Sequence, residues 1–388
     1  MIDHNSFLSE TLKDIKPSGI RKFFDLLADM GDVTALTVGQ PDFVTPWHIR
    51  EAAINSLERG QTYYTSNSGL KELREEISKY MQRRFDLEYA PEETLVTVGG
   101  SEAIDVAMRA LINEGDEVII PMPSFVCYEP IARMAGAKAV IINTKEENGF
   151  KLTAEELENA ITPKTKLLVL PYPNNPTGAI LTKEELENLA SVLRDKNIAV
   201  LSDEIYAELT FDGRHVSIAS IDGMRERTII ASGFSKAYAM TGWRLGYLCG
   251  PKDWITQMTK LHQYAIMCAP TVSQFAAVEA LKNGDEDIAD MCAEYNRRRV
   301  FIYEGLKKIG LPVLMPEGAF YIYPYIGGFG LTSEEFCQRL LMEERCAIVP
   351  GTAFGECGEG YARISYAYSV RHIEEALEKI QRFVDKIK

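Results

Sequence analysis

The stretch Thr228-Ile229-Ile230-Ala231-Ser232-Gly233-Phe234-Ser235-Lys236 places a serine and a lysine just after a short apolar run. An arginine, Arg244, follows eight positions after that lysine. A short apolar run of this kind is typical of a buried strand, and polar residues mark where such a strand stops. The stretch therefore predicts a strand whose end carries a lysine, a hydroxyl and a nearby arginine.

Four other apolar runs end in the same way, with glycine, aromatic, amide or carboxylate residues at the point where the run stops. These ends are Gly99-Gly100-Ser101, Pro123-Ser124-Phe125, Asn174-Asn175-Pro176-Thr177-Gly178 and Ser202-Asp203-Glu204-Ile205-Tyr206. In an open parallel sheet, ligands bind at the carboxyl edge, where the ends of the strands meet. We therefore expect the five strand ends to form one binding site.

The order of the patterns predicts an α/β fold. Seven short apolar runs alternate with helix-like segments. The runs are 94–98, 117–121, 138–142, 166–170, 198–202, 228–232 and 244–249. Examples of the helix-like segments are 101–113, 183–195 and 271–283. This alternation indicates a large domain with a mainly parallel seven-stranded sheet, covered by helices in a three-layer α/β/α arrangement.

The C-terminal part of the chain predicts a second, smaller α/β domain. A long amphipathic stretch over 285–309 is typical of a connecting helix. Beyond it, strand patterns lie at 320–324, 347–349 and 361–366, and helix patterns lie at 333–344 and 369–387.

Lys236, Ser235 and Arg244 suit a phosphorylated aldehyde cofactor. A lysine amine can hold an aldehyde as a Schiff base, while a hydroxyl and an arginine bind its phosphate. Pyridoxal 5'-phosphate fits this description. A lone Ser-Lys pair is weak evidence because most lysines are solvated surface charges, so the other strand ends carry much of the argument.

Seven motifs together resemble those of fold-type I, pyridoxal-phosphate-dependent aminotransferases of the class I/II family. They are Val38-Gly39-Gln40-Pro41-Asp42-Phe43, Gly99-Gly100-Ser101-Glu102-Ala103, Asn174-Asn175-Pro176-Thr177-Gly178, Ser202-Asp203-Glu204-Ile205-Tyr206, Ser235-Lys236, Gly242-Trp243-Arg244 and Arg363-Ile364-Ser365. The resemblance runs from about Ser18 to Lys388. It implies a large domain over 47–284, a small domain formed by 285–388 together with an N-terminal arm over 1–46, and a homodimer with a shared active site.

The resemblance implies a role for each residue around the cofactor ring. Lys236 is similar to the Schiff-base lysine, which also acts as the general base at the substrate Cα. Asp203 matches the carboxylate that keeps the pyridine nitrogen protonated, so that the ring is an electron sink. Tyr206 and Asn175 match the groups that face the ring hydroxyl, and Phe125 matches the aromatic that stacks on the ring. Structural alternatives are a helix N-cap for Asp203, a turn for Asn175 and core aromatics for the other two.

The residues predicted to bind the cofactor phosphate combine a helix start with donors from elsewhere in the chain. A helix N-terminus offers free N–H groups and a dipole that favours a phosphate, and a hydroxyl and an arginine add to it. Tyr64 aligns with a tyrosine that reaches the phosphate from the neighbouring subunit. The predicted set is Gly99, Gly100, Ser101, Ser235, Arg244 and Tyr64.

The predicted substrate-binding residues are Arg363, Gly39 and Asn175. Arg363 resembles the arginine that binds the substrate α-carboxylate, and an arginine inside an apolar strand needs such a partner. Gly39 leaves room for that carboxylate. Tyr264 stands approximately where aspartate aminotransferases carry an arginine for a second carboxylate, which disfavours a dicarboxylate donor. The segments 20–24 and 217–220 instead resemble aromatic and N-acetyl-diaminopimelate aminotransferases.

The predicted function is transfer of an amino group from an L-amino acid, aromatic or similar, to a 2-oxo acid, with 2-oxoglutarate as the expected acceptor. The mechanism is ping-pong through a Lys236 Schiff base. The alternatives are an N-acetyl-diaminopimelate or aspartate aminotransferase, or a carbon–sulfur β-lyase on the same scaffold. A cofactor-binding DNA regulator is disfavoured because no basic helix-turn-helix precedes Val33. A nicotinamide-binding enzyme is disfavoured because Gly99-Gly100 lacks the G-x-G-x-x-G spacing.

The composition of the chain bears on its expected partners, metal content and location. The chain has 388 residues, a net charge of −14 and a sequence pI near 5.0, which disfavour nucleic acid and anionic membranes as partners. Its seven cysteines are scattered without a CxxC pair, and its five histidines lack metal-ligand spacing, so we expect no disulfide framework and no metal. The N-terminus lacks the pattern of a signal peptide, so a cytoplasmic protein is expected.

Overall fold

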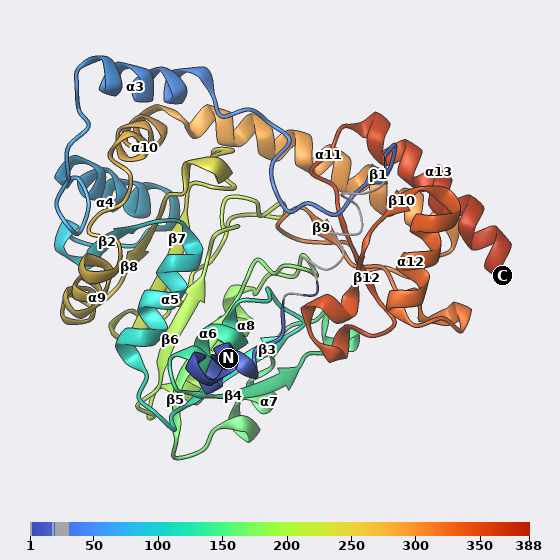
Figure 1. Ribbon diagram of the computed structural model, residues 1–388, viewed down its shortest axis with the longest axis horizontal. Coiled ribbons are helices and arrows are strands. Elements are labelled where there is room, and N and C mark those ends of the chain that lie inside the picture. Colours follow the sequence, from blue (N-terminus) through green and yellow to red (C-terminus); the bar gives the residue numbers. More distant parts are fainter. Residues whose placement is uncertain (1, 18, 20–30) are drawn as a thin grey trace.

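The computed structural model describes residues 2–17, 19 and 31–388. The sequence predictions that involve Ser18 and segment 20–24 lie outside these residues. The seven apolar runs all form strands of one sheet, as predicted (Figure 1). These strands are β2 (Thr94–Thr97), β3 (Glu117–Met122), β4 (Lys138–Asn143), β5 (Thr165–Leu170), β6 (Ala199–Asp203), β7 (Thr228–Gly233) and β8 (Gly246–Cys249).

The direction of the strands brings the predicted site residues to one edge of the sheet. The strand order is β2-β8-β7-β6-β5-β3-β4. Neighbours from β7 to β4 are parallel, whereas β8 is antiparallel to both β2 and β7. Because β2 and β7 each oppose β8, they run in the same direction. The carboxyl ends of every strand except β8 therefore lie at the same edge, where ligands bind in such sheets.

Alternate residues of β5 show why both faces of the sheet are covered. Leu167 and Val169 pack in one apolar cluster with α5 (Gly100–Leu111), α6 (Tyr128–Met134) and α9 (Lys252–Ala265). Leu168 and Leu170 pack in another cluster with α7 (Ala154–Ala160) and α8 (Lys183–Leu193). Successive side chains of a strand point to opposite faces, so two helical layers result. The predicted three-layer α/β/α arrangement is confirmed.

Three further helices complete the second layer. They are α3 (Trp47–Glu58), α4 (Lys71–Phe85) and α10 (Thr271–Asn283). These helices share a core with Val96 of β2 and Ile230 of β7. Both residues alternate with side chains of the opposite cluster, such as Leu95 and Ile229. The short helices His4–Phe7 and α1 (Glu10–Lys13) near the N-terminus contribute no buried residue.

The C-terminal part forms two small sheets that also take in residues from the N-terminal part. β1 (Thr34–Ala35) pairs in parallel with β10 (Cys346–Ala347). β12 (Ala362–Ser365) lies between β11 (Val349–Pro350) and β9 (Tyr321–Ile322), and both pairings are antiparallel. Helices α12 (Ser333–Glu344) and α13 (Val370–Ile387) cover them. The single strand predicted at 347–349 is wrong, because the chain there changes from one sheet to the other at Ile348.

Helix α11 (Asp285–Ile309) connects the two parts of the molecule, at the position predicted from the sequence (Figure 1). It ends at Gly310, whose φ of +90° is in the left-handed region that favours glycine. The domain limits proposed from the sequence, at 46/47 and 284/285, stay a prediction.

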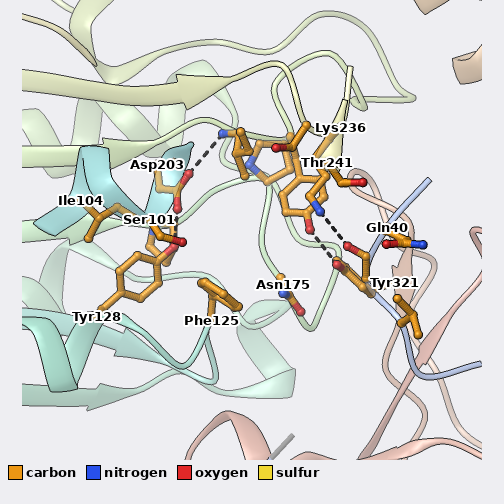
Figure 2. Close-up of a pocket in the computed structure, with 18 of the residues that line it drawn as sticks. Gln40, Ser101, Ile104, Phe125, Tyr128, Asn175, Asp203, Lys236, Thr241 and Tyr321 are labelled. Carbon is orange, nitrogen blue, oxygen red and sulfur yellow. Dashed lines mark hydrogen bonds between the residues drawn. The ribbon is translucent and has the colours of Figure 1, made fainter. Parts of the chain in front are cut away.

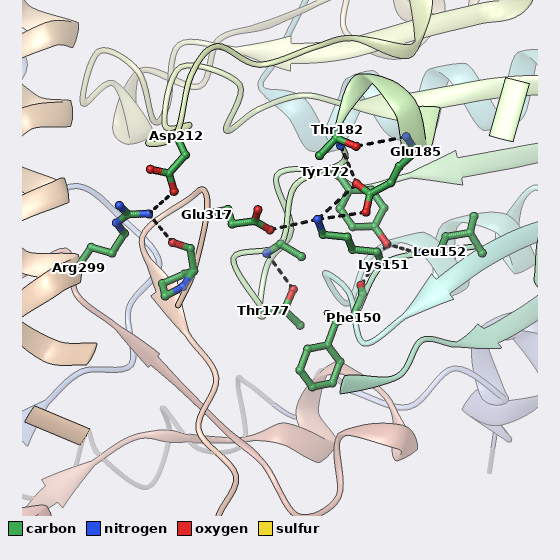
Figure 3. A network of polar contacts seen from close by, with 12 residues as sticks. Phe150, Lys151, Leu152, Tyr172, Thr177, Thr182, Glu185, Asp212, Arg299 and Glu317 are labelled. Atoms are coloured by element: carbon green, nitrogen blue, oxygen red, sulfur yellow. Dashed lines mark hydrogen bonds and ion pairs between the residues drawn. The ribbon is translucent and has the colours of Figure 1, made fainter. Parts of the chain in front are cut away.

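A polar network joins the connecting segment before β9 to the loop after β4 (Figure 3). Lys151 Nζ lies 3.3 Å from carboxylate oxygens of both Glu185 on α8 and Glu317. The backbone N–H groups of Glu317 and Gly318 donate to the Gly178 carbonyl, at 2.8 Å each. Gly178 belongs to the turn that carries Asn175, so this network fixes the small sheets against a turn of the predicted site.

Within the described residues, none of the helices has the length and apolar character needed to cross a membrane.

Candidate active site

The strand ends meet around one cavity of about 330 Å³. Figure 2 shows Asp203, Phe125, Asn175 and Lys236 around this space. Two segments that are distant in the sequence complete the wall, 37–40 before α3 and Arg363 on β12. Eleven of the thirteen predicted site residues line the cavity: Gly39, Gly100, Ser101, Phe125, Asn175, Asp203, Tyr206, Ser235, Lys236, Arg244 and Arg363.

Lys236 lies just past the end of β7, with its side chain inside the cavity. Its Nζ donates a hydrogen bond of 2.6 Å to the Gly39 carbonyl. Burial, followed by the charges of Arg363 and Arg244, lowers the pKa of Lys236 to about 8, with Asp203 opposing the shift. A lysine with a pKa near neutrality has a substantial unprotonated fraction, so it can serve as a nucleophile or a base.

Asp203 is the last residue of β6, and its carboxylate is buried. The carboxylate accepts a hydrogen bond of 2.7 Å from the Tyr128 hydroxyl and one of 3.2 Å from the Ile205 N–H. Burial raises the pKa of Asp203, whereas these two hydrogen bonds lower it. Donors that favour the ionised form suit a carboxylate that has to pair with a protonated ring nitrogen.

The turn that follows β5 presents Asn175 to the cavity. Asn174 Oδ1 accepts hydrogen bonds from the Thr177 N–H at 3.1 Å and from the Thr177 hydroxyl at 2.9 Å. A side chain that bonds the backbone three residues on fixes a tight turn. Asn175 Oδ1 then accepts a hydrogen bond of 3.1 Å from Arg363 Nη1. The two interpretations of Asn175, as a turn residue and as a site residue, are therefore compatible.

Arg363 is buried on β12 with hydrogen bonds on only part of its guanidinium. Besides the bond to Asn175, Nη2 donates to the Thr37 carbonyl at 2.5 Å. Nε is buried and has no hydrogen-bond partner among the described residues. Burial lowers the pKa of Arg363, and aromatic rings lie close to the guanidinium, with Tyr321 at 4.6 Å. A buried donor without an acceptor is rare, so this guanidinium suits an anionic ligand.

Tyr206 and Tyr321 form a hydroxyl pair at the floor of the cavity. Their hydroxyl oxygens lie 2.6 Å apart, and both side chains are buried. Burial raises the pKa of both phenols. Each phenol therefore stays protonated at neutral pH. When Tyr321 is the donor within the pair, the Tyr206 hydrogen is available to an oxygen in the cavity.

The start of α5 and Arg244 form the cationic end of the cavity. Gly99 has a φ of +81°, and a Cβ built on it would lie 2.8 Å from Arg244 Nη2. Only glycine allows this approach. The N-cap residue of α5 is Gly99, which has no side chain to cap the helix, and Gly100 and Ser101 line the cavity beside Arg244 and Ser235. Free N–H groups, a helix dipole and an arginine together suit a phosphate.

Gly99 and Tyr64 are the two predicted residues that do not line the cavity. Gly99 lies behind it, against Arg244. Both Tyr64 and Tyr264 lie on the molecular surface, where they are 79% and 87% exposed, respectively. Neither tyrosine lies in this cavity, so their predicted relation to a site requires a second subunit.

Two tyrosines that line the cavity, Tyr128 and Tyr321, were not among the predicted site residues. The signal for Tyr128 was weak: it lies three residues after Phe125 and begins α6, shortly after the end of β3. Tyr321 lies within the strand predicted at 320–324, but that pattern did not indicate that the strand reaches the cavity, which it does through pairing with β12.

The sequence matches the family "Aminotransferase class I and II" over residues 31–380, and the chain belongs to this family. It is a pyridoxal-phosphate-dependent aminotransferase, which acts on amino acids and 2-oxo acids.

The relatives carry different substrate names. The chain is 47% identical over 380 residues to the "Probable N-acetyl-LL-diaminopimelate aminotransferase" of Bacillus subtilis (strain 168), covering 98% of this chain and 96% of that one. It is 45% identical over 379 residues to the aspartate aminotransferase of Pyrococcus abyssi, covering 97% of each. The crystal structure of an aromatic aminotransferase from Pyrococcus horikoshii superposes with a TM-score of 0.90 at 44% identity, covering 94% of this chain and 99% of that one.

The cavity residues fit pyridoxal phosphate. The cradle that a Cβ at Gly99 would fill, together with Arg244 and the start of α5, suits its phosphate. Asp203 suits its ring nitrogen, and Lys236 suits its aldehyde. When bound, this cofactor supplies an electron sink and carries the amino group. The individual roles of these residues remain predictions.

Proposed function

We propose that this aminotransferase takes the amino group from L-amino acids with an aromatic or other apolar side chain and passes it to 2-oxoglutarate. The observation that carries the proposal is the charge of the cavity wall. Among the described residues, its cations are Lys236, Arg244 and Arg363, and each is already assigned to the cofactor or to the α-carboxylate. Much of the remaining wall is apolar or aromatic, including Val38, Phe125, Pro171, Pro173, Ile205 and Tyr321.

This wall favours an uncharged donor side chain. An ionised side-chain carboxylate would be buried without a cationic partner, which costs several kcal/mol, on the order of the penalty for an unpaired buried charge. An aromatic side chain buries apolar surface instead. The choice of 2-oxoglutarate as acceptor depends on the family resemblance.

We assign the chemical roles as follows. Arg363 binds the substrate α-carboxylate through its unpaired edge. Lys236, with a pKa of about 8, removes the proton from the substrate Cα and returns a proton to the product side. Asp203 remains ionised near the ring nitrogen, with Tyr128 as its donor. Tyr206 donates its phenolic hydrogen to the ring oxygen.

We also propose that the active form is a homodimer with Tyr64 reaching the partner's phosphate. The support is an exposed aromatic and apolar surface around the turn that follows α9, made of Tyr63, Tyr64, Tyr264, Ile266 and Met267. Its two segments are joined by hydrogen bonds, of 2.9 Å from Asn67 Nδ2 to the Met267 carbonyl and of 2.7 Å from the Thr271 hydroxyl to the Tyr63 carbonyl. Light scattering on Tyr64→Phe and the parent protein, with titration of pyridoxal phosphate, tests this arrangement.

The donor is tested by following the visible absorbance of the cofactor-loaded protein while single amino acids are added. The set contains phenylalanine, tyrosine, aspartate and N-acetyl-diaminopimelate, followed by 2-oxoglutarate. We expect the aromatic donors to change the spectrum and 2-oxoglutarate to restore it. A kcat/KM for aspartate above that for phenylalanine would contradict the proposed donor class.

The same experiment decides between the alternatives. N-Acetyl-diaminopimelate aminotransferase is the second candidate, because a relative of that name is 47% identical over nearly the whole chain. A response to N-acetyl-diaminopimelate alone would support it. Release of ammonia and pyruvate from cystathionine without a 2-oxo acid would indicate the β-lyase.

A further inference from the structure

Glu102 lies in the first turn of α5 and connects the phosphate loop, defined as Val98–Ser101, to helix α9. Its Oε2 accepts a short hydrogen bond from the Val98 N–H. Its Oε1 lies 2.6 Å from Nδ1 of His262 on α9. The Glu102 side chain is 13% exposed and that of His262 is 0% exposed. A carboxylate that is paired with a buried imidazole thus contacts the backbone where β2 ends and the loop begins.

The contacts of His262 indicate which of its ring nitrogens carries the proton. Nε2 of His262 is buried and has no hydrogen-bond partner among the described residues. A proton on Nε2 would be a buried donor without an acceptor, so the tautomer with the proton on Nδ1 is favoured. In this tautomer Nδ1 donates to Glu102. Both carboxylate oxygens of Glu102 therefore have a donor within the protein.

The position of Glu102 poses an electrostatic problem. Gly100, Ser101 and Ile104 line the cavity, whereas Glu102 between them does not. A carboxylate this close to the proposed phosphate site repels a phosphate dianion. Glu102 can favour phosphate binding only through the geometry that it fixes, and that geometry depends on the donors from Val98 and His262.

We propose that Glu102 and His262 are positioning residues that hold the phosphate loop in its binding geometry. Glu102 fixes the Val98 N–H four residues before it, and His262 fixes Glu102 against α9. The Gly100 and Ser101 N–H groups are then held toward the cavity beside Arg244. This inference depends on the proposed location of the phosphate, and its test separates the two.

The test compares two probes on the cofactor-free protein, pyridoxal phosphate and pyridoxal, which lacks the phosphate. In Glu102→Ala and His262→Leu, the affinity for pyridoxal phosphate should fall about tenfold or more, because charge-assisted hydrogen bonds on the loop are lost. The affinity for pyridoxal should change by less than about twofold, since it makes no phosphate contact. His262→Asn keeps a side-chain N–H near the position of Nδ1 and should recover most of the affinity.

A matched control lies on the same helix. Asp105 pairs with Arg109 at 2.8 Å on the exposed face of α5, so Asp105→Ala changes an acidic residue of α5 without touching the loop. It should leave both affinities unchanged. Pyridoxal binding and thermal unfolding show that each variant is folded, because a collapsed cavity would lose both probes.

Three outcomes would overturn the inference. Tighter or equal pyridoxal phosphate binding in Glu102→Ala would mean that repulsion outweighs geometry. Equal loss of both probes would indicate a general packing role. The third outcome uses Arg244→Gln and compares the preference for pyridoxal phosphate over pyridoxal. If Arg244→Gln loses this preference and Glu102→Ala keeps it, the phosphate site is correct but the positioning role of Glu102 is wrong. If Arg244→Gln also keeps its selectivity, the proposed phosphate site is wrong.

Discussion

Replacement of Gly39 by alanine should impair the enzyme through one identifiable atom. A Cβ at Gly39 would lie 2.3 Å from the Tyr321 hydroxyl oxygen, and the next nearest atom, Cζ of Tyr321, would be 3.3 Å away. Ordinary contacts begin near 3.4 Å. Either the hydroxyl or segment 37–40 therefore has to move by about 1 Å to restore normal contact.

Tyr321 has little freedom to move. Its side chain is 1% exposed, its hydroxyl is 2.6 Å from that of Tyr206, and its ring lies 4.6 Å from the Arg363 guanidinium. Segment 37–40 carries the carbonyl groups that accept hydrogen bonds from Lys236 and Arg363. Overpacking of this kind costs about 1–3 kcal/mol, so we expect kcat/KM to fall about 5- to 150-fold in Gly39→Ala.

The assay is a double-mutant cycle with Tyr321→Phe, which removes the oxygen and keeps the ring. In the Tyr321→Phe background, Gly39→Ala should cost about threefold or less, because the closest contact becomes 3.3 Å. Gly328→Ala is the control, since nothing lies within 4 Å of its Cβ position. An equal loss from Gly39→Ala in both backgrounds would refute the steric explanation.

Three further predictions concern charge. The pKa of Lys236 is lowered to about 8 in the folded protein, so the unfolded chain binds more protons between pH 8 and about 10.5. The stability of the cofactor-free parent should therefore rise with pH across this range, by up to about 3 kcal/mol relative to Lys236→Met. Urea unfolding measures this difference. A difference that stays constant with pH would contradict the shifted pKa. Lys151→Met leaves two partly exposed glutamates unpaired and should lower the free energy of unfolding by about 1–2 kcal/mol, whereas Lys145→Met, on an exposed pair, should change it by less than about 0.5 kcal/mol. Tyr128→Phe removes a hydrogen-bond donor to Asp203 and so raises the pKa of Asp203. Pyridoxal phosphate binding should weaken severalfold, and the acidic limb of the kcat profile should move to higher pH. Unchanged affinity and an unchanged pH profile would exclude this role of Tyr128.

Local patterns predicted the elements of the fold better than their pairing. The apolar runs and the helix over 285–309 were found because buried strands and amphipathic helices have strong periodicities. The insertion of β8 between β2 and β7 was not predicted, because strand order depends on contacts between distant segments. The change of sheet at Ile348 was missed for the same reason.

The site residues also divide into those that local patterns predict and those that depend on contacts between distant segments. Residues at the ends of long strands, such as Asp203 and Lys236, could be placed in one cavity from the rule that ligands bind at the carboxyl edge. Tyr321 could not, because it stands on a two-residue strand and contacts Gly39, which is 282 positions earlier in the chain. Packing across such separations leaves no periodic trace in the sequence.

Segment 37–40 connects the two parts of the molecule to the chemistry. The Gly39 carbonyl accepts a hydrogen bond from Lys236 at the end of β7, and the Thr37 carbonyl accepts one from Arg363 on β12. These are the two residues that the proposed reaction needs at the aldehyde and at the α-carboxylate. Arg363 can receive a carboxylate at Nε and keep its Nη2 bond to the Thr37 carbonyl. A covalent partner on Lys236 Nζ, in contrast, leaves that nitrogen fewer hydrogens for the Gly39 carbonyl. Chemistry at Lys236 and the position of segment 37–40 are therefore coupled through the hydrogen bond to Gly39, which is why a single methyl group at Gly39 is expected to affect both.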